Sequence, residues 1–170
     1  IDTWELEGEL PDGLTWTPAN QTIWGTPTEL MTTTQYTIWA NNTGGSVSAT
    51  LNITVNDEVP TTLSYSNPDL LLTNNTAMTP HDPITTGPGT VVTWDIVGEL
   101  PQGITFNSTT GIISGTPTEL MTTTQYSIWA NNTGGSISTV INITVVDQLP
   151  SLTYPLISLD LVVNLSLIHI

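Results

Sequence analysis

Apolar and polar residues alternate with a period of two along much of the chain. From Val47 to Val55 every second residue is apolar, and Ser, Thr or Asn lies between them. Successive side chains of a strand point to opposite faces, so this alternation predicts a strand with one buried face. Residues 4–7, 36–40 and 93–97 show the same pattern. A helical period is absent, except that Thr28 to Thr32 is compatible with a single helical turn.

Turn residues separate the predicted strands. Asn41 to Gly45 is rich in Asn and Gly and is expected to join residues 36–40 to the strand at 47–55 in a hairpin. Ser108 to Gly111 is expected to join a second hairpin, between residues 104–107 and 112–114. Many short strands punctuated by Gly, Pro and Asn are typical of an all-β sandwich.

The chain repeats itself with a period of 90 residues. Residues 25–59 return as residues 115–149 with 8 differences in 35 positions, so 27 positions are identical. A period of this length matches an autonomous domain. The predicted organisation is a truncated repeat at 1–59, a complete repeat at 60–149 and the start of a third at 150–164.

Truncation predicts that the first repeat exposes apolar side chains such as Leu6 and Leu10. The complete repeat is expected to bury an apolar core. Its predicted members are Tyr65, Leu71, Trp94, Ile96, Ile104, Phe106, Ile113, Tyr126, Ile128, Ile141 and Ile143.

The last six residues, 165–170, have a different interpretation. Codons that resemble a widely used transposase sequencing adapter would translate to their sequence, Leu-Ser-Leu-Ile-His-Ile. The hypothesis is that they are an assembly artefact, and the alternative is an ordinary apolar strand end.

Charge excludes several classes of protein. The chain has 15 Asp and Glu residues and no Lys, Arg or Cys, which gives a formal charge of −15. Binding to nucleic acids or to anionic membrane surfaces needs cationic side chains, so neither is expected. No apolar run reaches the roughly 18 residues of a membrane span, so membrane insertion is not expected either.

Catalytic residues are not predicted. Glu5, Glu7 and Glu9 share one strand face, but the corresponding residues 90 positions later include Val97, so a solvated face explains them better. A Ser, His and Asp constellation cannot be assembled in register in both repeats. The protein is therefore expected not to be an enzyme and to require no cofactor.

The segment from Leu100 to Val145 contains Leu-Pro-x-Gly-Ile-Thr-Phe-Asn, Gly-Thr-Pro-Thr, Tyr-x-Ile-x-Ala and Asn-x-Gly-Gly. These motifs resemble the immunoglobulin-like (cadherin-like) repeats of prokaryotic cell-surface proteins. Residues 10–55 resemble them nearly as well, departing at Trp24 and at residues 17–20. The acidic, Lys-free, Thr-rich composition is similar to that of giant surface proteins of planktonic marine archaea.

The resemblance implies a non-enzymatic extracellular module that acts as a stalk, spacer or adhesive repeat of a large cell-surface protein. Its expected partners are neighbouring repeats and surface glycans or proteins. The alternatives are a glycan-binding β-sandwich module and an accessory domain of a secreted enzyme.

Candidate binding residues lie at the repeat junctions and on one strand. Asp57, Glu58 and Asp147 offer hard oxygen ligands, which predicts calcium at the junctions unless they form an ion-free polar linker. Trp39 and Trp129 alternate out of phase with the core, so they either stack on a sugar ring or are covered by their own domain. Predicted glycosylation sites with the Asn-x-Ser/Thr pattern are Asn20, Asn41, Asn52, Asn74, Asn107, Asn131 and Asn142.

Overall fold

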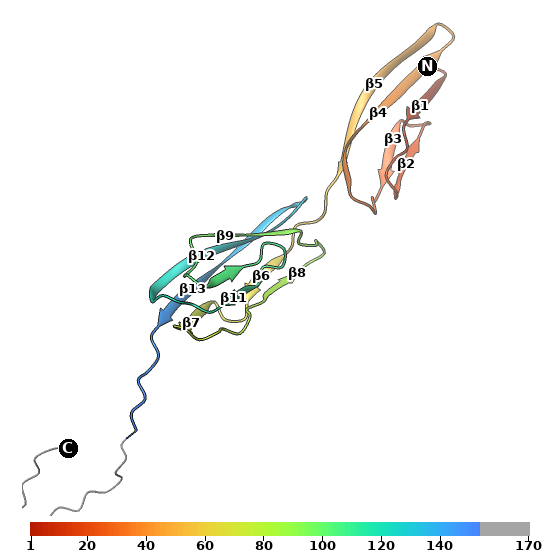
Figure 1. Cartoon of the computed structure of the whole chain (residues 1–170). Helices are drawn as coiled ribbons and strands as arrows, with labels where there is room; N and C mark the ends of the chain where they lie inside the picture. Colours follow the sequence, from red (N-terminus) through yellow and green to blue (C-terminus); the bar gives the residue numbers. More distant parts are fainter. Residues whose placement is uncertain (154–170) are drawn as a thin grey trace, which may run out of the picture.

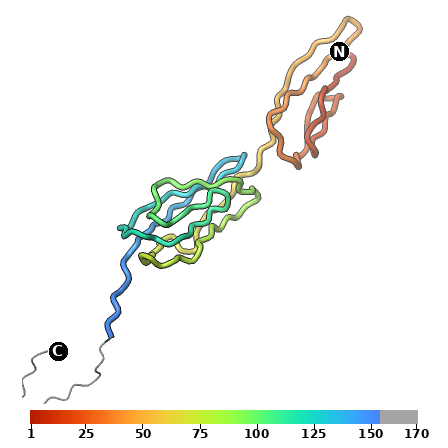
Figure 2. Tube along the Cα trace, viewed as in Figure 1, coloured from red at the N-terminus to blue at the C-terminus, as the bar shows by residue number. Residues whose placement is uncertain are grey.

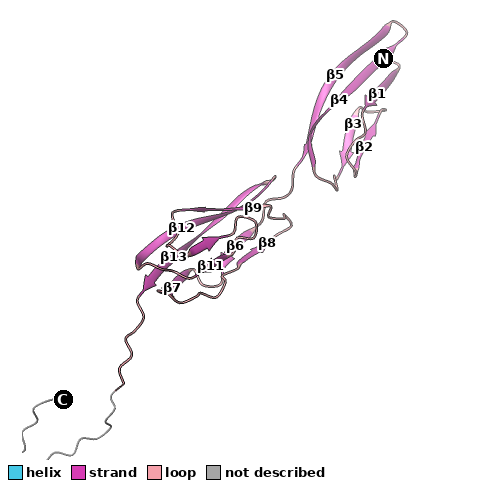
Figure 3. Cartoon of the chain, in the orientation of Figure 1, coloured by secondary structure: helices cyan, strands magenta, loops and turns pink. Residues whose placement is uncertain are grey.

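The computed structural model describes residues 1–153, and its regular elements are all β-strands (Figure 3). Strands β1–β5 and strands β6–β13 form two bodies that follow one another end to end (Figures 1 and 2). The predicted all-β class is confirmed. Residues 165–170 and most of the predicted third repeat lie outside the described residues.

The first repeat (residues 1–59) has a three-stranded antiparallel sheet in the order β1-β4-β5. A separate hairpin, β2-β3, lies beside this sheet (Figure 1). The strand bounds are β1 Thr3–Glu7, β2 Leu14–Thr17, β3 Thr22–Gly25, β4 Met31–Asn42 and β5 Gly45–Val55.

The second repeat (residues 60–149) has a four-stranded sheet in the order β7-β13-β12-β9, in which β7 runs parallel to the last part of β13. The hairpins β6-β8 and β10-β11 form the opposite layer, and a β-bridge between His81 and Ile113 connects them. The strand bounds are β6 Thr62–Tyr65, β7 Asp69–Thr73, β8 Pro83–Thr86, β9 Thr93–Val97, β10 Ile104–Phe106, β11 Ile113–Gly115, β12 Met121–Asn132 and β13 Gly135–Val146.

The core of the second repeat fills the space between these layers. Ile96 and Phe106 are half-buried and pack against it. Eight of the eleven predicted members are among its buried residues, which are Leu63, Tyr65, Leu70, Leu72, Trp94, Ile104, Ile113, Tyr126, Ile128, Ala130, Ile141, Ile143 and Val145.

Leu71 is the member of the predicted core that is wrong, since 69% of its surface is exposed. The parallel register pairs Leu70 with Ile143 and Leu72 with Val145, and both partners face the core. Three consecutive leucines carry no alternation, so the sequence could not fix which of them points inward.

The single helical turn with which Thr28 to Thr32 is compatible does not form. Met31 and Thr32 already belong to β4, and residues 26–30 form an irregular connection. The Thr28 backbone N–H donates a hydrogen bond to the Asp12 carbonyl at 2.9 Å. This long-range bond holds the segment extended against the turn before β2.

Candidate functional site

The connection between the two repeats, residues 57–60, is bound tightly to the second repeat. The Asp57 N–H donates to the Thr133 hydroxyl at 2.9 Å, and the Asn132 side-chain amide donates to the Glu58 carbonyl at 2.6 Å. The second Asp57 carboxylate oxygen accepts a hydrogen bond from the Thr90 N–H at 3.0 Å. Two loops of the second repeat therefore clamp the linker.

One of these loops is the tip of the β12–β13 hairpin, residues 132–135, which we call the second tip because it belongs to the second repeat. Asn132 shapes it, because its side-chain carbonyl accepts hydrogen bonds from the N–H groups of Gly134 and Gly135 at 2.9 and 3.1 Å. This Asx turn directs the Asn132 amide outward, where it donates to the linker. One side chain thus both forms the turn and binds the neighbouring segment.

Two glycines allow the linker to approach. A Cβ atom added at Gly134 would overlap the Asp57 carbonyl, and one added at Gly89 would overlap the Glu58 carbonyl. Gly135 has a φ of 147°, so its backbone conformation explains why a glycine occurs there. The φ of Gly134 is not left-handed, so conformation does not explain that glycine. Gly134 is needed for contact rather than for the turn.

The sequence analysis treated the equivalent residues 41–45 only as a turn and did not predict this contact. Adjacent glycines are also ordinary in a tight hairpin turn, so the sequence offered no signal that separated the contact from the turn.

The predicted calcium ligands occupy both ends of the second repeat. Each Asp57 carboxylate oxygen accepts a backbone N–H, one from Glu58 and one from Thr90. Asp147 accepts the Gln148 N–H at 2.9 Å in the same way. Among residues 1–153 no group of three His, Asp or Glu side chains is placed to hold a metal ion. Calcium at the junctions remains a prediction.

The two predicted stacking residues lie in different surroundings. The Trp39 indole N–H donates to the Glu7 carboxylate at 3.0 Å, and the Trp39 ring is half-buried. Val97 takes the place of Glu7 in the second repeat, and Trp129 is 39% exposed. The ring that is more available for stacking is therefore that of Trp129, and its ligand role remains a prediction.

The predicted glycosylation sites differ in accessibility. Asn20, Asn52 and Asn107 are exposed, while Asn41, Asn74, Asn131 and Asn142 are half-buried. The amide nitrogen that would carry a glycan donates to the Asp95 carboxylate in Asn131, and to the Asp69 carboxylate in Asn142.

One expected location among these sites needs correction. Asn41 and Asn131 lie within β4 and β12 rather than in turns. Strand pairing continues to the Asn42–Gly45 and Asn132–Gly135 pairs, so each turn contains only two residues.

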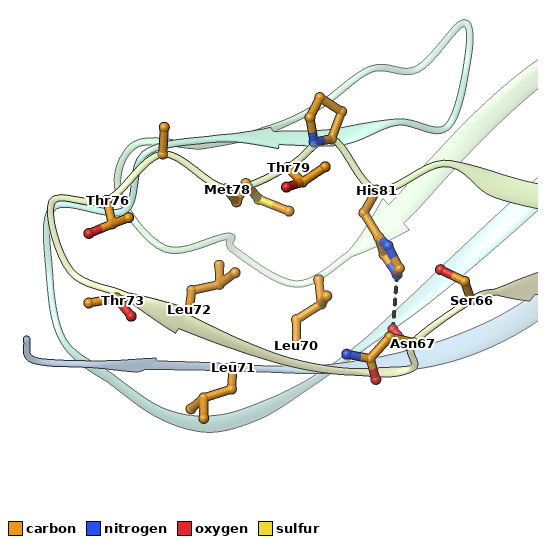
Figure 4. Close-up of a pocket in the computed structure, with 12 residues that line it drawn as sticks. Ser66, Asn67, Leu70, Leu71, Leu72, Thr73, Thr76, Met78, Thr79 and His81 are labelled. Atoms are coloured by element: carbon orange, nitrogen blue, oxygen red, sulfur yellow. Dashed lines mark hydrogen bonds between the residues drawn. The ribbon is translucent and has the colours of Figure 1, made fainter.

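A hollow of about 430 Å³ lies between β7 and the loop that leads to β8 (Figure 4). His81 is the one titratable side chain that lines it, and its Nε2 atom lies 2.9 Å from the Asn67 carbonyl oxygen. The His81 ring also packs against Tyr65, with the centroids 5.0 Å apart. The hollow brings no acid–base pair together.

Two buried tyrosines brace the second repeat. The Tyr65 hydroxyl donates to the Gly111 carbonyl at 2.6 Å, and the Tyr126 hydroxyl donates to the Glu99 carbonyl at 2.9 Å. Burial and then the Asp82 carboxylate raise the pKa of Tyr65 above its usual value. Burial, then Glu119 and Glu99, raise the pKa of Tyr126. Both hydroxyls therefore keep their protons and serve as structural donors.

Within residues 1–153 no helix has the length and apolarity that a membrane span requires. Solved structures similar to the chain include murine CEACAM1b, with 12% identity, a TM-score of 0.46 and coverage of 85% of this chain and 84% of that one. Extracellular domains 3–5 of Drosophila OTK match with 20% identity, a TM-score of 0.43 and coverage of 86% and 51%.

Similar sequences come from Staphylococcus aureus. The "Serine-rich adhesin for platelets" of strain MRSA252 is 30% identical over 134 residues, and that of strain USA300 is 31% identical over 134 residues. The match covers 76% of this chain but only 10% and 6% of the two adhesins. The family model described as "Putative Ig domain" matches residues 2–56 and 60–146, so the chain belongs to this family of immunoglobulin-like domains.

Proposed function

We propose that the two repeats are part of a non-enzymatic stalk or spacer of a large extracellular surface protein. The observation that carries this proposal is the position of the two ends of the second repeat. The linker enters at the second tip, beside Thr133, and the chain leaves after Val146 at the far end of β13. Entry and exit lie at opposite ends of one strand.

The length of that strand sets the reach of each repeat. With a rise of about 3.4 Å per residue, the 12 residues of β13 span about 40 Å. A linker fixed by three hydrogen bonds adds this length to that of the repeat before it. An array of such repeats would be an extended rod, as the end-to-end arrangement in Figure 1 illustrates.

Similarity to the staphylococcal adhesins supports a location on the cell surface, because those proteins are named as adhesins. The chain covers a tenth or less of their length, so adhesion itself belongs to the proposal rather than to the match. Neighbouring repeats are the partners for which contacts are observed.

A distance measurement between the repeats tests the spacer. The chain has no cysteine, so Ser48→Cys and Ser138→Cys provide two exposed and equivalent positions for spin labels. We expect pulsed electron–electron double resonance to show a single narrow distribution of the distance between the two spin labels. Inserting four Gly and Ser residues between Asn56 and Asp57 is the control, which should broaden the distribution.

A broad distribution in the unmodified chain, similar to that of the insertion variant, would contradict the spacer. A rigid rod requires that the linker hydrogen bonds persist in solution. Gly134→Ala should also broaden the distribution, because the added Cβ displaces Asp57 from the second tip.

The exposed ring of Trp129 supports glycan binding as a second candidate. Titration with a panel of oligosaccharides should then quench tryptophan fluorescence in the unmodified chain but not in Trp129→Ala. Identical curves for the two proteins would remove Trp129 as the stacking residue.

A further inference from the structure

The hairpin tip of the first repeat has the same sequence as the second tip and shares its Asx turn. Residues 42–45, which we call the first tip, read Asn-Thr-Gly-Gly as residues 132–135 do. The Asn42 side-chain carbonyl accepts the Gly44 N–H at 2.8 Å, and the φ of Gly45 is 139°. The first tip therefore adopts the linker-binding shape without a linker.

Nothing among residues 1–153 covers the first tip. A Cβ atom added at Gly44 would meet only the Asn42 side chain, 3.2 Å away, and one added at Gly45 would meet nothing within 4 Å. In the second tip the same additions would meet the Asp57 backbone and, 3.0 Å away, the Val59 side chain. The surface that holds the linker in one repeat is open in the other.

The matching segment is present at the other end of the chain. Residues 147–150, Asp-Gln-Leu-Pro, align with residues 57–60, Asp-Glu-Val-Pro. Asp147 accepts the next N–H in the chain at 2.9 Å, as Asp57 does. Leu149 is 94% exposed, while its counterpart Val59, held beside Gly135, is 41% exposed.

We propose that the first tip is a docking site for the linker of another repeat of this kind, with the sequence Asp-x-apolar-Pro. The Thr43 hydroxyl accepts a hydrogen bond from the backbone N–H of the linker Asp, and the Asn42 side-chain amide donates to the backbone carbonyl of the residue after that Asp. Gly44 leaves room for the linker backbone. The docking site deepens the spacer role and depends on it, since it names the interface by which successive repeats are joined.

The tip is suited to this acidic partner. It has no charged side chain, and it offers a neutral amide donor and a hydroxyl acceptor in a chain that carries 15 carboxylates and no Lys or Arg. Hydrogen bonds to a neutral tip join the repeats without bringing further carboxylates together.

An extended chain tests the docking site. A copy of residues 55–90 is placed directly before Ile1, which restores the 90-residue register and brings a second Asp57 to the first tip. We expect the amide of this added Asp57 to be protected from hydrogen exchange, and Gly44→Ala to speed its exchange at least tenfold. Gly134→Ala should have the same effect on the native Asp57, as the matched control.

The unextended chain supplies a second comparison. Gly44→Ala should leave its unfolding midpoint unchanged, because Gly44 has no left-handed φ and the new Cβ meets only a flexible side chain. A synthetic peptide of residues 145–152 at millimolar concentration should shift the NMR signals of residues 42–45. The signals of residues 132–135 should stay in place, because the native linker occupies that tip.

Two results would overturn the docking site. One is that the amide of the added Asp57 is unprotected and exchanges at the same rate with and without Gly44→Ala. The other is that the peptide leaves the NMR signals of residues 42–45 unchanged. Neither result would affect the spacer if the spin-label distances remain narrow, because those distances report the native junction. A broad spin-label distribution would contradict the spacer independently of the first tip.

Discussion

Ile53 and Ile143 are aligned residues in nearly identical strands, yet their environments differ. Each is paired with a threonine of the preceding strand, Thr34 or Thr124. Ile143 is fully buried, whereas Ile53 is only half-buried. The difference comes from strand β7, which pairs with β13 beside Ile143, and from β6, which packs against β13. The described first repeat has no strands equivalent to these.

The same comparison holds at other aligned positions. Leu51 is half-buried while Ile141 is 1% exposed, and Ile23 is half-buried while Ile113 is fully buried. Val47, which was predicted to face inward, is 67% exposed, whereas its counterpart Ile137 packs against the core. The prediction for Val47 was wrong because its face of the sheet lacks an opposing strand. Leu6 and Leu10, predicted to be exposed, are half-buried, as are their counterparts Ile96 and Leu100 in the second repeat, so the missing strands do not affect these positions.

Some features are the same in both repeats. Tyr36 is 2% exposed and Tyr126 is fully buried. The Tyr36 hydroxyl donates to the backbone carbonyl of Glu9, and the Tyr126 hydroxyl donates to that of Glu99. The partners of each tyrosine lie within the segment that both repeats contain. Local packing is therefore conserved where all its partners are present, and burial is lost where they are supplied by residues 60–90.

The largest expected effect is on the core. Ile143→Ala should lower the free energy of unfolding of the second repeat by about 2–5 kcal/mol, because it opens a cavity in a closed core. Ile53→Ala should cost clearly less in the first repeat, where water already reaches the side chain. Urea unfolding followed by residue-resolved hydrogen exchange distinguishes the two repeats.

The extended chain sharpens this first prediction. With a copy of residues 55–90 before Ile1, the cost of Ile53→Ala should rise toward that of Ile143→Ala. Equal costs in the unextended chain would show that the missing strands do not explain the difference in burial.

Alkaline pH should weaken the second repeat next. Tyrosine in an unfolded chain has a pKa of about 10, and burial raises the pKa of Tyr65 and Tyr126. The stabilisation is complete below pH 10 and is lost as the pH rises further, by about 1.4 kcal/mol per pH unit for each protonated tyrosine. Thermal unfolding from pH 8 to 12 measures this slope.

Tyr65→Phe is the matched variant, since the described first repeat has no counterpart of Tyr65. It should reduce the alkaline slope of the second repeat while lowering its stability near neutral pH by about 1 kcal/mol, through loss of the hydrogen bond to Gly111. An unchanged slope would show that Tyr65 is not a source of the pH dependence.

Salt should have the smallest effect of the changes considered. Its effect should be larger on the first repeat than on the second. The 6 carboxylates of residues 1–56 are more densely placed than the 8 of residues 57–149, which include the clamped linker, and neither part has Lys or Arg. Screening relieves this repulsion, so the midpoint of the first repeat should rise more with ionic strength. Thermal unfolding resolved by repeat in low and high NaCl measures the difference, and a larger rise in the second repeat would contradict it.

The same experiment at matched ionic strength tests the calcium prediction for Asp57, Glu58 and Asp147. A calcium site predicts that Ca²⁺ raises the midpoint more than Mg²⁺ does, and that Asp147→Asn removes this increment. Equal midpoints with the two cations would contradict the calcium prediction.

Local alternation predicted the hairpin strands well, because the hydrogen bonds of β4 with β5, and of β12 with β13, join residues close in sequence. The phase of β7 could not be predicted, since its partner β13 lies about 70 residues away. The linker clamp was missed for the same reason. Asp57 and Thr133 are 76 residues apart, and neither has a sequence signature of its own.

The sequence alone determined the class of the fold, the 90-residue period and the absence of cationic chemistry, since these depend on composition and on patterns within one strand or one repeat. Tertiary structure decided which of the two nearly identical copies closes its core and which of the two identical tips holds a linker. The physical reason is that burial and docking depend on what lies opposite a surface. Two segments with the same sequence present the same surface, and only their neighbours in space can distinguish them.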